Sequence, residues 1–167
     1  MFAKLKNSRG FTIVELLIVI IVIAILATLV ITTYNGVQSK ARDDKRRTDI
    51  NAIQGQVEAY NAQYGYYPLA SDMNDPTFRT NNLKGLQAPA AIQDPQWKTG
   101  NANCTDTTVT PNIPKFQVSA TPASGCYGYT STASDGSTCD NSATPCATYT
   151  LTANLEDGTN YQKTGSD

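Results

Sequence analysis

A single carboxylate stands near the start of the longest apolar run in this chain. The run reads RGFTIVELLIVIIVIAILATLVI, from Arg9 to Ile31, and Glu15 is its only acid. An isolated charge inside hydrocarbon costs at least a few kcal/mol. The only cation of the run, Arg9, lies at its very start, before Gly10. We therefore expect Glu15 to pair with a group that the rest of the run does not supply.

The composition argues against catalysis. The chain has no histidine, which removes Ser-His and Cys-His nucleophilic catalysis and histidine-containing zinc sites. Its acids are scattered through turn-like segments such as SDMNDP and EDGTN, as expected for solvated loops. We predict that the chain is not an enzyme and that it needs no cofactor and no metal.

The four cysteines all lie in the polar C-terminal part: Cys104, Cys126, Cys139 and Cys146. An even number of cysteines in a small domain rich in Thr and Ser indicates two disulfides and an oxidising compartment. Three pairings are possible, and we favour Cys139 with Cys146 and Cys104 with Cys126. The spacing of six residues between the last two cysteines does not fit a zinc knuckle.

The N-terminal part has the features of a membrane segment. Lys4, Lys6 and Arg9 make the first nine residues basic, so this end should stay in the cytoplasm. The apolar stretch from Phe11 to Ile31 is long enough to cross a bilayer as a helix. It is too long for an ordinary secretory signal and lacks a convincing A-x-A end. We expect a single-pass membrane protein whose C-terminal part lies outside the cytoplasm.

The segment KNSRGFTIVELLIVIIVIAILATLV resembles the class III signal of type IV pilins and type II secretion pseudopilins. The shared pattern is a short basic leader, a glycine, a phenylalanine, a glutamate four residues later and a long apolar helix. The resemblance covers Lys4 to Val30. The segment from Lys40 to Pro68 also resembles the region that follows the span in this family.

The resemblance implies that a prepilin peptidase cuts between Gly10 and Phe11 and that the new amine of Phe11 is N-methylated. It also implies that Glu15 pairs with the Phe11 amine of a neighbouring subunit during assembly. Pairing within one chain is an alternative, because residues four apart are neighbours on a helix. Many family members carry a helix-breaking glycine and proline in the span, where this chain has Ala24 and Thr32.

A second helical pattern follows the span, from Lys40 to Tyr64. Its apolar residues recur at helical spacing and predict one buried stripe: Ile50, Ile53, Val57, Tyr60 and Tyr64. Gly65 and Pro68 predict the end of the helix. A basic cluster precedes the stripe: Lys40, Arg42, Lys45, Arg46 and Arg47. We expect phospholipid head groups or acids of neighbouring subunits to bind this cluster, with DNA as a weakly supported partner.

The polar part is predicted to begin with irregular chain, Leu69–Pro114, with helical turns near Asn82–Leu86 and with Trp97 anchoring the loop. Four strands are predicted to follow, at residues 116–120, 126–131, 147–156 and 160–163. The expected fold is α+β: a long N-terminal helix packed on a small antiparallel sheet, as in pilins. Asp135, Asp140 and Asp157 lack a recognisable calcium-ligand spacing, so a calcium site here is only a weak hypothesis.

The expected organisation has four parts: a cleaved basic leader (residues 1–10), a membrane and assembly helix (11–35), an amphipathic helix (36–65) and an exported loop-plus-sheet domain (66–167). We predict a structural subunit of a type IV pilus-like filament, a homo-oligomer that depends on prepilin peptidase, the membrane and a pilus assembly platform. It would move from the membrane to an extracellular filament. One alternative is a pseudopilin of a type II secretion or competence system. A second is a membrane-anchored binding domain that does not polymerise.

Overall fold

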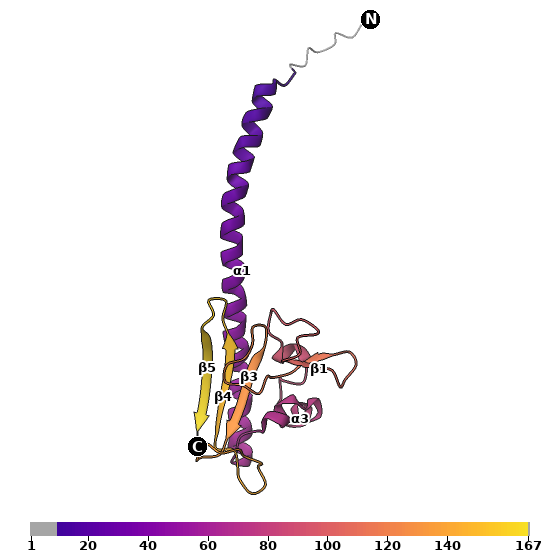
Figure 1. Cartoon of the computed structure of the whole chain (residues 1–167), viewed down its shortest axis with the longest axis vertical. Coiled ribbons are helices and arrows are strands. Elements are labelled where there is room, and N and C mark those ends of the chain that lie inside the picture. Colours follow the sequence, from indigo (N-terminus) through magenta and orange to yellow (C-terminus); the bar gives the residue numbers. More distant parts are fainter. Residues whose placement is uncertain (1–9, 167) are drawn as a thin grey trace, which may run out of the picture. The chain divides into compact units, whose positions relative to one another are not determined.

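The computed structural model describes residues 10–166 (Figure 1), and its contacts divide the chain into two units, residues 1–39 and 40–167. Helix α1 (Ile13–Tyr64) contributes to both units. The basic residues predicted to form the leader, Lys4, Lys6 and Arg9, lie outside the described residues.

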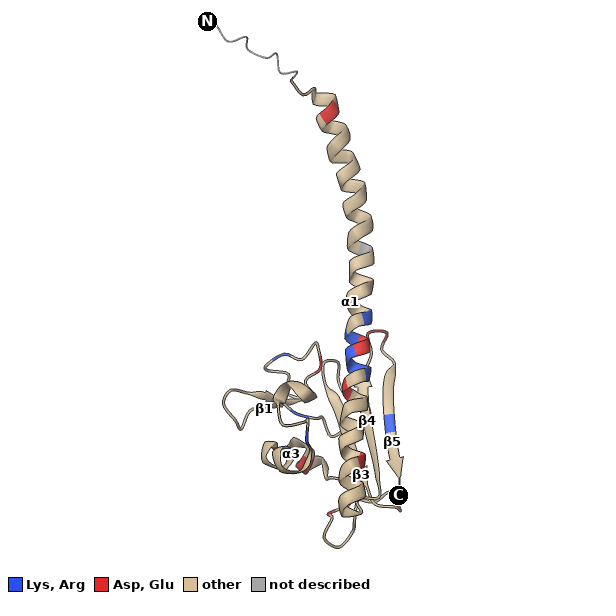
Figure 2. Cartoon of the chain, turned by 180° about the vertical axis from the view of Figure 1, so that it is seen from behind, with Lys and Arg blue, Asp and Glu red and all other residues tan. Residues whose placement is uncertain are grey.

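The first unit consists of the N-terminal part of α1, and its apolar side chains are exposed on every side. The large ones from Ile13 to Val37 are 46–80% exposed, and the helix is long and apolar enough to cross a membrane. Between residues 10 and 39 Glu15 is the only charged residue. Figure 2 shows one isolated acidic turn near the start of the helix ribbon. A helix is suited to hydrocarbon because it pairs its backbone groups internally. The hydroxyl of Thr33 adds a bond to the carbonyl of Leu29, at 3.0 Å.

The second unit places the remainder of α1 against a three-stranded sheet. Ile50, Ile53 and Val57 are fully buried and Tyr60 nearly so, which confirms most of the predicted stripe, although Tyr64 is 42% exposed. Gly65 ends the helix as predicted. It adopts a left-handed φ of 78°, and its amide donates to the carbonyl of Asn61 at 2.7 Å.

The sheet is antiparallel in the order β3 (Tyr127–Thr132), β4 (Thr148–Asn154) and β5 (Asn160–Ser166), which lie side by side in Figure 1. Alternate residues of β4 face the core: Tyr149, Leu151 and Ala153 are buried. A short hairpin, β1 (Thr105–Asp106) and β2 (Ile113–Pro114), forms a separate two-stranded sheet. The predicted α+β fold, with a long helix and a small antiparallel sheet, is confirmed.

The segment predicted as irregular contains three short helices: α2 (Ala70–Asn74), α3 (Pro76–Asn82) and η1 (Pro89–Ile92). The helical turns predicted near residues 82–86 fall between α3 and η1, where the structure has one turn, in which the Leu86 amide donates to the carbonyl of Leu83 at 3.0 Å. Asp75 caps α3, because its side chain accepts the amide of Thr77 at 2.8 Å, and Pro76 fills the first helical position. The Asp-Pro pair in SDMNDP thus starts a helix, although it reads equally well as a turn.

The predicted strand at residues 116–120 is wrong. Only Gln117 pairs there, in a single parallel bridge to Gly128. The side chain of Asn74 accepts the amide of Phe116 at 2.7 Å and donates to its carbonyl at 3.1 Å. The amide of Ser119 then turns back to the carbonyl of Gln117, so the chain leaves the sheet.

Both disulfides of the structure match the pairing favoured from the sequence. Cys104 joins Cys126 with the Cα atoms 5.7 Å apart, and Cys139 joins Cys146 with the Cα atoms 5.1 Å apart. The first disulfide lies beside Trp97, whose indole nitrogen donates to the carbonyl of Cys104 at 3.1 Å. Trp97 therefore anchors its loop, as expected.

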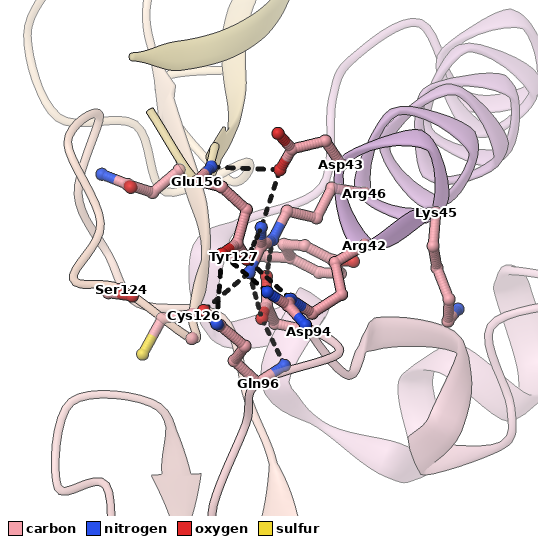
Figure 3. Close-up of polar contacts among 12 residues, drawn as sticks. Arg42, Asp43, Lys45, Arg46, Asp94, Gln96, Ser124, Cys126, Tyr127 and Glu156 are labelled. Atoms are coloured by element: carbon pink, nitrogen blue, oxygen red, sulfur yellow. Dashed lines mark hydrogen bonds and ion pairs between the residues drawn. The ribbon is translucent and has the colours of Figure 1, made fainter. Parts of the chain in front are cut away.

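A buried ion-pair network joins α1 to two loops of the second unit (Figure 3). Arg46 is 1% exposed, and its Nε and Nη2 donate to the two carboxylate oxygens of Asp94 at 2.7 and 3.2 Å. Its Nη1 lies 2.8 Å from both Asp43 and Glu156. Arg42 adds a bidentate pair with Glu156, in which both bonds are 2.9 Å long. The carboxylates of Asp43, Asp94 and Glu156 therefore compensate the charge of the Arg46 guanidinium, which would be costly to bury without them.

This network corrects the prediction for the basic cluster. Arg42 and Arg46 pair with acids of their own unit, which are partners that the prediction did not include. Lys45 pairs with Asp49 at 2.8 Å, and the guanidinium of Arg47 lies 4.8 Å from the centre of the Tyr161 ring. The physical reason is that α1 turns the Arg46 side of the cluster toward the domain core.

Replacing Asp94 with alanine should destabilise the second unit by about 3–5 kcal/mol, because it leaves the buried Arg46 guanidinium without its main carboxylate. Urea unfolding of the full chain in detergent micelles, followed by near-UV circular dichroism, measures the change. Asp44→Ala is the matched control, since Asp44 is an exposed carboxylate of the same helix, and it should change stability by no more than about 0.5 kcal/mol. A loss below about 1 kcal/mol for Asp94→Ala would contradict the role given to the network.

The network should also make the second unit sensitive to acid. The hydrogen bonds from Arg42, with further bonds and charge from Arg46, lower the pKa of Glu156 from 4.5 to about 2. A carboxyl whose pKa is lower in the folded state stabilises the fold above its unfolded pKa, and this stabilisation is lost as pH falls toward the folded value. We expect the melting temperature to fall between pH 4.5 and about 2. Glu156→Gln should be less stable at pH 6 and should show a shallower fall; an unchanged pH profile would argue against the pairing.

Candidate functional site

The candidate site is the N-terminal end of the apolar helix. Gly10, Phe11 and Thr12 precede α1 without regular structure and are exposed, with Phe11 at 80%. The predicted cleavage bond between Gly10 and Phe11 is therefore in an accessible segment, immediately before the helix. A peptidase can bind an irregular segment as an extended strand without first unwinding a helix.

Thr12 and Glu15 form a reciprocal hydrogen-bonded pair at the first turn of α1. The backbone amide of Thr12 donates to Oε2 of Glu15 at 2.9 Å, and the Thr12 hydroxyl donates to the same oxygen at 2.8 Å. In return, the amide of Glu15 lies 3.2 Å from the Thr12 hydroxyl oxygen. This arrangement is a capping box, in which each residue satisfies an amide that the start of a helix leaves unpaired.

The capping box corrects the expectation that the apolar run offers Glu15 no partner. The signal was present in the sequence as Thr12-Ile13-Val14-Glu15, which has the T-x-x-E spacing of a capping box. A carboxylate at the first turn is also favoured by the helix dipole. Glu15 therefore has a local structural role in the single chain, in addition to any role between chains.

The geometry leaves part of the carboxylate available. Both bonds from Thr12 go to Oε2, and within residues 10–166 no hydrogen bond is found to Oε1. Glu15 is also exposed, as are the apolar residues that surround it. The site can therefore accept one more donor, such as an amine, without breaking the capping box.

The aspartates considered for calcium instead stabilise turns of the second unit. Asp140 accepts the amides of Ser142, Ala143 and Thr144 at 2.9 Å, and these bonds lower its pKa to about 2. Asp135 and Asp157 each accept an amide two residues ahead. Among the described residues, no group of three or more metal-ligating side chains comes together.

Comparison with known proteins agrees with this site. Residues 5–31 match the model of the prokaryotic N-terminal methylation motif. The type II secretion system core protein G of Dickeya chrysanthemi is 35% identical over 63 residues, which cover 38% of this chain and 41% of that protein. The core protein G of Escherichia coli K12 is 37% identical over 65 residues, covering 39% of this chain and 45% of that protein. The chain thus spans less than half the length of these relatives.

A ComG operon protein 3 homolog of Bacillus licheniformis is 33% identical over 81 residues, which cover 47% of this chain and 81% of that protein. This chain belongs to the type IV pilin and pseudopilin family. No solved structure matches it. The methylation motif of this pilin-family chain includes Gly10, Phe11, Thr12 and Glu15, the residues that form the site at the start of α1.

Thr12→Val should weaken the capping box of this pilin-family chain and leave membrane insertion unchanged. Loss of an N-cap side chain costs about 1 kcal/mol, so the Glu15 amide should exchange its hydrogen about fivefold faster. NMR hydrogen exchange on the full chain in micelles measures this rate. Thr12→Ser should keep the slow rate, and Thr33→Val, which removes a hydroxyl further along the helix, should not affect Glu15. Equal rates in wild type and Thr12→Val would mean that the cap does not form.

Proposed function

We propose that the chain is a structural subunit of a type IV pilus-like surface filament. The observation that carries this proposal is the apolar helix, whose side chains are exposed all round and whose only charge lies one turn from Phe11. A simple membrane anchor needs the apolar surface, and its use for Glu15 ends at the capping box with Thr12, which engages only Oε2. A subunit that packs its helix among identical helices has a use for both.

The chain would first reside in the membrane as a single-span precursor. Its basic leader would stay in the cytoplasm, and the second unit, with its two disulfides, would lie outside. A prepilin peptidase would then cut after Gly10, and the new amine of Phe11 would be N-methylated. The exposed, irregular segment at residues 10–12 supports this step because it is accessible to a peptidase.

Assembly would then pair the Phe11 amine of one subunit with Glu15 of its neighbour. Each charge is costly alone in an apolar surrounding, and pairing relieves both costs. The available Oε1 of Glu15 supports this contact, since the amine can bind there while Thr12 keeps Oε2. The membrane, the peptidase and a pilus assembly platform would be the partners, and the chain itself would have no catalytic activity.

The second candidate is a pseudopilin of a type II secretion or competence system. It is favoured by the relatives, which are named type II secretion system core protein G and ComG operon protein 3 homolog. Both candidates share the cut, the methylation and the helix-mediated assembly. They differ in the product, since a pilus extends from the cell surface as a long filament and a pseudopilus acts inside the secretion apparatus.

Mass spectrometry of the mature protein tests the processing step. We expect the mature chain to begin at Phe11 and to carry one methyl group on its amine. The same sample from a strain that lacks the prepilin peptidase should retain Met1 and the full leader. A mature chain that begins at Met1, or far beyond Ile31, would exclude the proposed function.

Glu15→Val tests the assembly step. It makes the helix more apolar, so insertion and cleavage should continue, but the Phe11 amine would have no partner in the filament. Removing one member of a buried pair costs about 3–5 kcal/mol at each contact. We expect processed subunits to accumulate in the membrane and few or no filaments in the sheared fraction by electron microscopy and immunoblot.

Two matched variants sharpen this experiment. Glu15→Asp keeps the charge and should assemble at an intermediate level. Val14→Leu changes an apolar neighbour of Glu15 and should assemble normally. Normal filament yield from Glu15→Val would refute the pairing role, and processed wild-type subunit that never forms filaments would favour the non-polymerising anchor.

A further inference from the structure

The second unit contains an open groove of about 840 Å³. Its walls are the loop from Pro95 to Asn101 and the turn at Ser124 and Gly125, and Arg42 of α1 lies at one side. Its volume falls within the range of about 300–1,000 Å³ found for small-molecule sites. Ser124, Gln96 and Arg42 appear around this region in Figure 3.

The two walls of the groove are held firmly together. Cys104 and Cys126, which follow the two walls in the sequence, are joined by a disulfide. Asn101 donates to the sulfur of Cys126 at 3.3 Å and lies 3.5 Å from the carbonyl oxygen of Ser124. A Cβ atom on Gly125 would stand only 3.1 Å from the carbonyl oxygen of Gln96, so the walls meet as closely as glycine allows. A site fixed in this way loses little entropy when a ligand binds.

The residues on the walls combine an aromatic ring with uncharged polar groups. Trp97 is half-buried, and its Nε1 is already bonded, so the indole is fixed in position. Thr99 and Ser124 are exposed hydroxyl residues, and neither hydroxyl has a hydrogen-bond partner within residues 10–166. Lys98 is also exposed and adds donors, whereas Arg42 is occupied by Glu156. No carboxylate lines the groove.

We propose that this groove binds a neutral oligosaccharide. The apolar face of a pyranose ring can pack on the indole of Trp97. The hydroxyls of the sugar can donate hydrogen bonds to, and accept them from, the hydroxyls of Thr99 and Ser124. Lys98 can donate to a ring or hydroxyl oxygen. The site lies on the second unit and is independent of the proposed filament function, to which it would add recognition of a glycan surface.

A nucleic-acid strand is the main competing ligand, because tryptophan and lysine also suit stacked bases and phosphates. The charge of the domain opposes it. The second unit, residues 40–167, has thirteen acids against ten bases, and the Arg42 charge is balanced by Glu156. A polyanion would meet a unit of net negative charge, and Arg42, the other cation of the lining beside Lys98, is already paired. The electrostatics therefore favour an uncharged ligand.

Trp97 is the only tryptophan of the chain, so its fluorescence reports on the groove directly. The full chain is held in lauryldimethylamine oxide micelles, which carry no sugar head group, and titrated with cellohexaose, maltoheptaose and N-acetylchitohexaose. Hexathymidylate is titrated as the nucleic-acid probe. We expect at least one oligosaccharide to change the emission saturably, with a dissociation constant of about 1 mM or tighter, and hexathymidylate to produce no saturable change.

Variants then locate the binding. Thr99→Ala combined with Ser124→Ala should weaken the dissociation constant at least about tenfold, the loss expected when two hydroxyl contacts disappear. Thr107→Ala combined with Ser134→Ala removes two exposed hydroxyls outside the groove and should leave it unchanged. The proposal is overturned if no oligosaccharide binds, if hexathymidylate binds instead, or if the groove variant binds as well as its control. None of these results depends on cleavage, methylation or filament formation.

Discussion

The apolar surface of the first unit is the constraint on which everything else depends. Seen as a single chain, the helix from Ile13 to Val37 exposes its large apolar side chains on all sides. Removing one such side chain from water is favourable by about 1.5–3 kcal/mol. Exposing the whole surface to water would therefore cost tens of kcal/mol. Only a bilayer or other apolar helices can cover it. A subunit that leaves the bilayer for a helix-packed filament, as proposed, would pass from one apolar environment to the other without crossing water.

This exchange changes which interaction decides assembly. Lipid tails and neighbouring helices are similarly apolar, so moving the helix from the bilayer into a filament changes its hydrophobic free energy little. The difference must come from close packing and from the few polar groups in the helix. In the part of the helix from Ile13 to Ser39, Glu15 is the only charged residue. A pairing that contributes a few kcal/mol is small compared with the free energy of burying the whole apolar surface. It is large compared with the net free-energy change when the helix moves from the bilayer into a filament.

The sequence was informative where one local pattern determined the result. The apolar run, the buried stripe as far as Tyr60 and the cap at Gly65 each depend on residues close in the chain, and these were predicted correctly, whereas Tyr64 was wrongly included in the stripe. The failures came where distant residues decided. Arg46 reads as part of an exposed basic cluster until Asp94 and Glu156, 48 and 110 residues away, are placed beside it. The segment at Phe116 has the composition of a strand, but the backbone amide and carbonyl of Phe116 are hydrogen-bonded to the side chain of Asn74 instead of to another strand. Thr12 is a different case, because its T-x-x-E signal was local and legible.

The capping box bears on how Glu15 can be kept in the membrane before assembly. A bare carboxylate there would oppose insertion, yet Thr12 gives Oε2 two hydrogen bonds at 2.8–2.9 Å within the same turn. These bonds stabilise the carboxylate while the subunit is in the membrane before assembly. They therefore also reduce the free energy that pairing with an amine can add. They do not compete with pairing for the same atom, because Oε1 accepts no hydrogen bond from the described residues. An incoming amine would therefore add a charge-assisted bond to a carboxylate already oriented by the helix. The proposed pairing therefore needs no rearrangement of the capping box.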